Sequence, residues 1–211
     1  MCIEGNEVTY TQIDSCYESD KDLHDSLTKI ISAPESTQNQ QMLYAKWIDS
    51  PLGEMLILTD DTALHLLEFT GRRGLYTEIT KLKEKYKYAI VPGENVITTS
   101  IQEELKSYFD STLTLFSTQV KFYGSVFQHS VLHTLQTIPY GETRSYKEQA
   151  KILHKPTAVR AIARANGQNQ LAIIIPCHRV IGANGHLTGY VGGLLRKKWL
   201  LEHEARNITN I

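Results

Sequence analysis

The sequence predicts an α/β fold in which an antiparallel sheet with helices is followed by a mostly helical second half. Between residues 43 and 69, three short runs of strand-forming residues follow one another at hairpin spacing. From residue 126 on, apolar residues recur instead at the spacing of one helical face, at Phe127, Val131, Leu135 and Ile138. A chain of 211 residues with 41% hydrophobic content is long enough for one large or two small domains.

Composition divides the chain into three predicted parts. Residues 1–41 are an acidic extension, expected as a tail or a loosely attached helix, because their acidic start and polar end (residues 36–41) bury little apolar surface. Residues 42–118 are the N-terminal α/β domain, with strands expected at 44–48, 54–59 and 63–69 and turns at 50–53 and 60–61. Charged helices are expected over residues 76–88 and 101–110. Residues 119–211 form the C-terminal domain.

The C-terminal domain is predicted to begin with a helix over 126–138, which the turn at residues 139–142 ends. Ser145 and Glu148 then form a capping box, which predicts a short helix to about residue 154. After the break at residues 155–157, Thr157 is expected to cap a helix over 158–166 that Gly167 ends. Two short helices joined by a tight turn, the second with Arg160 and Arg164, are a candidate helix-turn-helix.

The last part of the chain contains the most reactive residue type. The apolar run 171–175 predicts a buried strand that Pro176 ends, and Cys177 follows at once. His178 and Arg179 are expected to favour a Cys177 thiolate, although a cysteine after a buried strand is often an inert core residue. An Asn-Gly turn at residues 184–185 and a helix over 194–205 follow. Glu202 or Glu204 of that helix could orient a buried histidine.

Charge is distributed unevenly along the chain. Residues 1–120 hold 10 Lys and Arg against 19 Asp and Glu, whereas residues 121–211 hold 12 against 4, so net charges of −9 and +8 give the total of −1. A basic module that carries a helix-turn-helix candidate favours nucleic-acid binding over a merely solvated charged face.

Other features of the sequence exclude several classes of protein. No apolar stretch is long enough for a membrane span, and the N-terminus lacks the layout of a signal peptide, so we expect a soluble intracellular protein. Three cysteines without a Cys-x-x-Cys pair argue against a disulfide framework and leave little support for a zinc site at Cys2, Cys16 and His24.

Several motifs together carry a family resemblance. They are Ile138-Pro139-Tyr140-Gly141-Glu142, Ser145-Tyr146, Ala158-Val159-Arg160, Asn169, Ile175-Pro176-Cys177-His178-Arg179-Val180 and Gly189-Tyr190-Val191-Gly192-Gly193-Leu194. From about residue 127 to 204 the chain resembles the 6-O-alkylguanine-DNA alkyltransferases (methylated-DNA-protein-cysteine methyltransferases). This resemblance implies a ribonuclease H-like N-terminal sheet and a winged-helix-like DNA-binding domain with the helix-turn-helix.

The resemblance implies a role for individual residues. Cys177 would accept the alkyl group, and His178 and Glu204 would complete a relay that removes the thiol proton through water. Asn169 would brace the active-site loop. Tyr146 would help to rotate the damaged nucleotide out of the duplex through the minor groove and to neutralise the charge on the departing guanine oxygen. Arg160 would fill the vacated space in the duplex, beside the DNA-contacting residues Thr157, Ala158 and Ala161. The base pocket would include Val180, Tyr190, Val191 and Gly192.

The implied reaction uses no cofactor and no metal, because the lesion supplies the alkyl group. It consumes the protein, because a thioether is not hydrolysed. The partner would be double-stranded DNA with alkylated guanine, and also 4-O-methylthymine; we expect a monomer, cytoplasmic in a bacterium and nuclear in a eukaryote. With such close resemblance, Arg179 is expected to hold the active-site loop and not to touch DNA.

Two departures and two alternatives accompany this interpretation. Gln170 stands where the family often has proline, which could loosen the loop, and Val191 stands where some members have a serine that contacts the base. A thiol hydrolase could use the same Cys-His-Glu relay, but it needs no arginine-bearing helix-turn-helix. A nonreactive lesion-binding module would lack the nucleophilic cysteine, and Cys177 is present.

Overall fold

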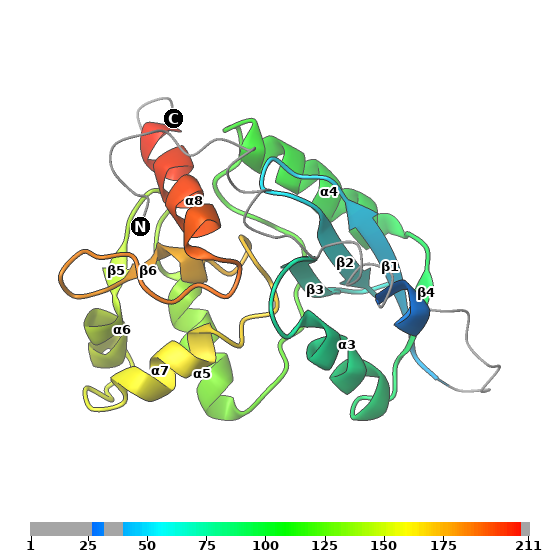
Figure 1. The fold of residues 1–211 in the computed structure, drawn as a ribbon, viewed down its shortest axis with the longest axis horizontal. Coiled ribbons are helices and arrows are strands. Elements are labelled where there is room, and N and C mark those ends of the chain that lie inside the picture. Colours follow the sequence, from blue (N-terminus) through cyan, green and yellow to red (C-terminus); the bar gives the residue numbers. More distant parts are fainter. Residues whose placement is uncertain (1–26, 32–39, 208–211) are drawn as a thin grey trace.

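The computed structural model describes residues 27–31 and 40–207. A four-stranded sheet with helices α3 and α4 forms one side of the molecule, and helices α5 to α8 gather on the other side (Figure 1). The described helices are all too short or too polar to cross a membrane. Cys2, Cys16 and His24, the weakly supported zinc ligands, lie outside the described residues.

The sheet contains strands β1 (Met42–Ile48), β2 (Met55–Thr59), β3 (Leu64–Phe69) and β4 (Ala89–Pro92), in the order β3-β2-β1-β4. The first three pair in antiparallel fashion, as their hairpin spacing predicts. β4 was not predicted, and it pairs in parallel with β1. The expected helix 76–88 is shorter for the same reason: α3 (Leu75–Glu84) ends early, and Lys87, at φ 62°, lies in the turn that leads into β4.

The two faces of the sheet are covered by different helices (Figure 1). Because side chains alternate along a strand, Met55 and Ile57 pack on α4 (Val96–Phe109), while Leu56 and Leu58 pack on α3. α4 starts five residues earlier than expected, since the Asn95 side chain caps it by accepting a hydrogen bond from the Thr98 N–H at 3.0 Å.

Part of the acidic extension belongs to the core. Residues 27–30 are helical, and Leu27 and Ile31 are fully buried with Leu43, Leu66 and other residues between the sheet and α3. The prediction that the extension buries little is therefore wrong for this segment. Its polar composition concealed two apolar residues four positions apart, which is the spacing of one helical face.

The edge strand β3 holds the segment that leads to Cys177. The Leu67 N–H donates to the Gln170 carbonyl at 2.9 Å, and the Ala172 N–H donates to the Leu67 carbonyl at 2.8 Å. Apart from this bridge, residues 171–175 form turns, so the predicted strand is wrong. Ile173 has a φ of 70°, a strained conformation for a β-branched residue, which breaks the ladder although the run is almost as buried as a strand.

The second half contains α5 (Val126–Gln136), α6 (Tyr146–Ile152), α7 (Val159–Asn166) and α8 (Leu194–Asn207). The capping box of Ser145 and Glu148 is confirmed. The prediction that Thr157 caps α7 is wrong: the N-cap is Ala158, without a side-chain hydrogen bond, because the chain enters α7 through a turn that ends one residue later. Strands β5 (Arg144–Ser145) and β6 (Val180–Ile181) pair in parallel beside these helices.

We predict that Leu27→Ala lowers the free energy of unfolding by about 2–5 kcal/mol, because it leaves a cavity under the sheet. Urea denaturation of the full chain measures the change. The control is Lys29→Ala, which alters an exposed side chain two residues away and is expected to stay within about 0.5 kcal/mol. Equal stability of the Leu27→Ala protein and the unmodified protein would mean that the extension does not contribute to the core.

Candidate active site

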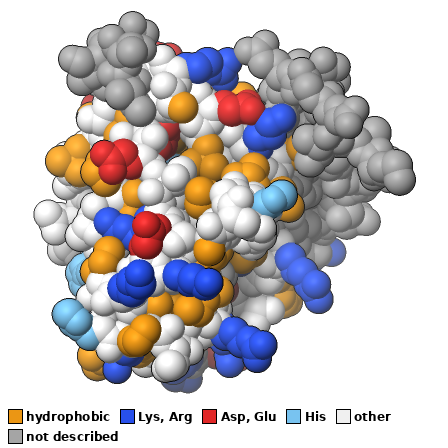
Figure 2. Space-filling model, turned by 90° about the vertical axis from the view of Figure 1, so that its left-hand side faces the viewer, with side chains coloured by type: hydrophobic (Ala, Val, Ile, Leu, Met, Phe, Trp, Pro, Cys, Tyr) orange, Lys and Arg blue, Asp and Glu red, His pale blue; other side chains and the backbone are white. Residues whose placement is uncertain are grey.

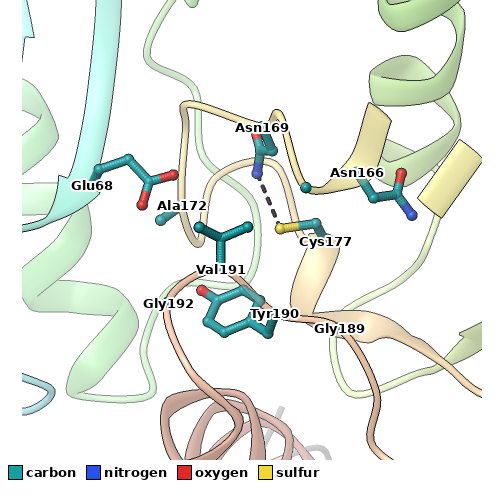
Figure 3. Close-up of a pocket in the computed structure, with 10 residues that line it drawn as sticks. Glu68, Asn166, Asn169, Ala172, Cys177, Gly189, Tyr190, Val191 and Gly192 are labelled. Atoms are coloured by element: carbon teal, nitrogen blue, oxygen red, sulfur yellow. Dashed lines mark hydrogen bonds between the residues drawn. The ribbon is translucent and has the colours of Figure 1, made fainter. Parts of the chain in front are cut away.

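Cys177 lies at the wall of a cavity between the two halves of the molecule (Figure 3). It is the first residue of a short 3-10 helix, η1 (Cys177–Arg179), and its side chain is partly exposed. The cavity is narrow and opens to solvent, and its space together with the open mouth amounts to about 320 Å³. Strand β3, the end of α7 with the segment that follows it, and the loop before α8 form its walls. Besides Cys177, the lining residues are Glu68, Asn166, Gly167, Asn169, Ala172, Gly189, Tyr190, Val191 and Gly192.

Asn169 fixes the conformation of the segment before Cys177. Its side-chain N–H group donates to the Ile175 carbonyl at 2.9 Å and to the Cys177 sulfur at 3.2 Å (Figure 3), while its Oδ1 accepts from the Leu171 N–H at 3.1 Å. The amide of Asn169 therefore provides hydrogen-bond partners for the irregular backbone that replaces the predicted strand, and it also orients the Cys177 thiol. A hydrogen bond to sulfur stabilises the thiolate form.

The electrostatic surroundings of Cys177 differ from those that the sequence predicted. Burial raises the pKa of the Cys177 thiol to about 11, against the lowering effects of the Asn169 hydrogen bond and of the cations Lys197 and Arg72. The neighbouring Arg179 was expected to favour a thiolate, but its guanidinium is engaged with Glu204. At neutral pH the thiol is therefore protonated, and a reaction at sulfur needs a base.

Glu204 is the centre of a buried polar network behind Cys177. Its carboxylate accepts hydrogen bonds from Tyr108 Oη at 2.8 Å, the Gly141 N–H at 3.0 Å, His178 Nε2 at 2.8 Å and the Arg179 guanidinium at 2.8 and 3.0 Å. These bonds join α4, the turn after α5, η1 and α8. His178 and Arg179 keep the pKa of Glu204 well below its usual value, although burial acts in the opposite direction, so the carboxylate is charged.

The bond to Glu204 fixes the tautomer of His178. Because a carboxylate only accepts, Nε2 carries the proton and Nδ1 is left with a free lone pair. Nδ1 is buried and makes no hydrogen bond to any protein atom in the described ranges. Burial lowers the pKa of His178 despite the attraction of Glu204, so the imidazole is neutral at pH 7. A neutral, oriented imidazole is a competent general base.

Arg179 has a structural position. It is buried, and its Nη1 donates to the Ile138 carbonyl at 2.7 Å while its other nitrogens bind Glu204. This geometry agrees with the expectation that Arg179 holds the active-site loop; an exposed side chain would have contradicted it. Gln170 is also anchored, because its carbonyl accepts from the Leu67 N–H, so the structure shows no loosening at this departure from the family pattern.

The loop of residues 182–193 forms a second wall of the cavity. Gly185, at φ 79°, makes the predicted Asn-Gly turn, and Tyr190, Val191 and Gly192 line the cavity. A Cβ at Gly192 would lie 2.7 Å from the Tyr190 ring, so only glycine fits there. Val180, which was expected in the pocket, does not line it: its side chain is buried in the core, on β6.

Lys197 is a site residue that the sequence analysis missed. It is fully buried on α8, and its Nζ donates to the Val180 carbonyl and, at 2.7 Å, to the Thr188 carbonyl. These bonds tie the loop to β6. Burial lowers the pKa of Lys197 to about 8, against the opposing effect of Cys177. The seven-residue spacing from Lys197 to Glu204 places both on one helical face, and this was the available signal.

Glu68 and Arg72 were also missed, because the N-terminal domain contained no recognisable motif. Glu68 is buried, and Arg72 Nε lies 3.0 Å from its carboxylate. The guanidinium of Arg72 also binds Glu78 of α3. An acidic residue within the predicted strand 63–69, four residues before an arginine, was the only sequence signal.

The predicted DNA-contacting residues lie outside the cavity. Arg160, Thr157 and Ala161 are exposed at α7, and Ala158 is partly exposed. Lysine and arginine side chains gather over the lower part of this side of the molecule (Figure 2), and the exposed ones on and between α6 and α7 are Lys147, Lys151, Lys155, Arg160 and Arg164. Tyr146, at the start of α6, donates to the Gly189 carbonyl at 3.3 Å, so it connects this surface with the cavity loop.

The described residues contain no group of three or more histidine, cysteine or acidic side chains that could hold a metal ion.

We predict that Glu204→Gln lowers the free energy of unfolding at pH 7 by about 3–5 kcal/mol, because it leaves Arg179 buried without its counter-charge. The folded-state pKa of Glu204 is depressed, so the carboxylate stabilises the fold fully above the ordinary glutamate pKa of 4.5, and this stabilisation is lost progressively as the pH falls from there towards the folded-state pKa. The difference between the two proteins should therefore shrink as pH is lowered from 7 to 3 in urea denaturation. Glu202→Gln on the same helix is the control, and a similar loss there would contradict the assignment.

Comparison with known proteins identifies the family. The family described as 6-O-methylguanine DNA methyltransferase, DNA binding domain, matches residues 126–206. A methylated-DNA–protein-cysteine methyltransferase of Mycolicibacterium paratuberculosis is 41% identical over 79% of this chain and 94% of its own length, and one of Methanosarcina barkeri is 38% identical over 79% and 99%.

Solved structures agree with the sequence relatives. The Mycobacterium tuberculosis OGT in complex with DNA has a TM-score of 0.67 at 38% identity, over 79% of this chain and 94% of that one. The O6-methylguanine-DNA methyltransferase of Pyrococcus kodakaraensis has a TM-score of 0.56 at 26% identity, over 77% and 99%. From its sequence and its fold alike, this chain belongs to the methylated-DNA–protein-cysteine methyltransferase family, whose members repair DNA.

Proposed function

We propose that the protein repairs alkylated guanine in duplex DNA by moving the alkyl group from the guanine O6 atom to the sulfur of Cys177. The observation that carries this proposal is the position of Cys177: it lines a cavity that opens to solvent, its sulfur accepts a hydrogen bond from the Asn169 amide, and His178, which is hydrogen-bonded to Glu204, lies beside it in the sequence and in η1. The relatives' methyltransferase activity supports the same reaction.

The reaction balances without a cofactor. The Cys177 sulfur attacks the alkyl carbon in line with the carbon–O6 bond; a carbon–sulfur bond forms as that bond breaks, and guanine departs with both bonding electrons. The thiol proton passes through water to His178 Nδ1, the departing guanine takes up a proton from water, and His178 then returns its proton to the solvent. Tyr146, whose hydroxyl lies at the cavity loop, supports the charge that develops on O6.

His178 solves the problem that the thiol pKa creates. With the pKa of Cys177 raised to about 11, very little thiolate exists at neutral pH, and a neutral imidazole held by a charged Glu204 supplies the missing base. The imidazolium that forms is stabilised by the same carboxylate. Because the product is a thioether, each protein molecule reacts once.

Access to the cavity requires the damaged nucleotide to leave the base stack. We propose that α7 enters the minor groove with Thr157, Ala158 and Ala161 at the DNA and Arg160 in the vacated space, while Asn169 braces the junction between α7 and Cys177. The exposed lysines of α6 supply phosphate contacts. Because one chain holds all these residues, the protein acts as a monomer in this proposal. A second proposed substrate of the same pocket is 4-O-methylthymine.

The two alternatives predict different stoichiometry. A thiol hydrolase with the same relay turns over many times, whereas a lesion-binding module leaves Cys177 unmodified. The surroundings of Cys177 argue against a lesion-binding module. A protein that only binds the lesion needs neither the hydrogen bond that fixes the tautomer of His178 nor the one from Asn169 to the Cys177 sulfur. The basic helix pair next to the cavity opposes the hydrolase.

We predict that incubation with a duplex that bears one O6-methylguanine adds a single methyl group to Cys177. Intact-mass measurement of the protein should show a gain of one methylene, with repair limited to one equivalent. Cys177→Ser, which keeps the size of the side chain but not the soft nucleophile, should show none. Repair far beyond one equivalent would favour a hydrolytic activity, and no mass change on reduced protein would refute the transfer.

We predict that Arg160→Ala slows repair of the duplex by about tenfold or more but leaves the reaction of Cys177 with free O6-benzylguanine within about twofold, because the exposed Arg160 lies outside the cavity. Single-turnover rates on both substrates measure the effect. Arg73→Ala, an exposed arginine of the N-terminal domain, is the matched control and should change neither rate. Equal losses on both substrates would contradict this role of Arg160.

A further inference from the structure

The cavity wall opposite Cys177 contains a carboxyl side chain that the transfer reaction does not use. Glu68 belongs to β3, in the half of the chain that carries no recognised motif, yet its carboxyl group faces the same space as the Cys177 sulfur, Val191 and the Tyr190 ring (Figure 3). Among the described residues that line the cavity, Glu68 is the only one with a carboxyl group.

The geometry of the transfer brings the alkyl group close to this wall. In-line attack holds the reacting carbon between the sulfur and O6, so any substituent larger than methyl must extend sideways from that carbon. The sulfur points into the space bounded by Ala172, Val191, Tyr190 and Glu68 (Figure 3). Ala172, Val191 and the Tyr190 ring offer apolar contact there, and Glu68 offers the polar one.

Glu68 is held in place for this role. Arg72 Nε lies 3.0 Å from its carboxylate, and Arg72 is itself fixed by Glu78, so the carboxyl group is rigid and almost inaccessible to bulk water. Burial raises the pKa of Glu68 to about 7, against the lowering effect of Arg72. Such a group gains much from a hydrogen-bond donor and is destabilised by a second negative charge.

We propose that Glu68 selects among O6-alkyl adducts, so that the protein prefers adducts that donate a hydrogen bond, such as 2-hydroxyethyl, over apolar adducts of equal size, and rejects anionic ones. This inference rests on the proposed function, since it concerns the alkyl group that Cys177 accepts. It assigns to the N-terminal domain a direct part in substrate choice.

The test compares adducts within each protein, so that a general change in reactivity cancels. Duplexes carry one O6-(2-hydroxyethyl)guanine, its isostere O6-n-propylguanine, or the anionic O6-carboxymethylguanine, and single-turnover rates are measured with the full chain. The proteins are unmodified, Glu68→Leu, Glu68→Gln and the control Glu78→Gln. The control loses a carboxylate that binds the same Arg72 but does not line the cavity.

We expect the unmodified protein and Glu78→Gln to react about tenfold faster with the hydroxyethyl than with the propyl adduct, which is the effect of one hydrogen bond to the buried carboxyl group. In Glu68→Leu this preference should disappear or reverse. In Glu68→Gln, the rate with the carboxymethyl adduct relative to hydroxyethyl should rise about tenfold or more. If Glu68→Leu fails to fold, the isosteric Glu68→Gln decides alone.

Failure of this inference is distinguishable from failure of the proposed function. If the unmodified protein transfers methyl from O6-methylguanine but both rate ratios are the same in Glu68→Gln and Glu78→Gln as in the unmodified protein, Glu68 has no part in selection and the transfer to Cys177 stands. If the unmodified protein accepts no alkyl group from any duplex, the proposed function fails and the inference fails with it.

Discussion

The active site depends on the buried carboxylate of Glu204. Burying an ion is costly unless its hydrogen bonds are satisfied, and here Tyr108, Gly141, His178 and Arg179 satisfy them from four separate segments of the chain. The network therefore exists only when those segments are correctly assembled. Because Tyr108 belongs to α4, the orientation of the His178 imidazole depends on the N-terminal domain as well as on η1, which carries Cys177 and His178.

The N-terminal sheet is thus part of the site and not merely an attached domain. Its edge strand β3 pairs with residues 170–172 and so holds the irregular segment that leads to Cys177. The same strand carries Glu68 into the cavity wall, while Lys197 fixes the opposite wall by binding the loop carbonyls. The shape of the cavity is therefore determined by β3, the segment 170–172 and α8, which lie far apart in the sequence. The motif residues of the cavity all come from the C-terminal domain.

Local signals in the sequence predicted the parts of the structure that local interactions determine. The hairpin spacing predicted β1 to β3, and the Ser145 capping box predicted the start of α6. The prediction of a strand at residues 171–175 was wrong, because an apolar run predicts burial but not backbone conformation. The hydrogen bonds of Asn169 and the positive φ of Ile173 determine the backbone conformation there. Glu68 and Lys197 were missed because their importance comes from long-range packing, whereas Cys177 and His178 lay within a recognisable motif.

The high pKa of the Cys177 thiol has a consequence for the lifetime of the protein. Cellular oxidants and electrophiles attack thiolates, and susceptibility follows thiolate character and exposure. A residue that can be used only once is damaged permanently by any side reaction. By keeping the sulfur protonated and supplying the base from a histidine buried behind it, the fold preserves the thiol in storage, so that a molecule made long before the damage still has its nucleophile intact when a lesion arrives.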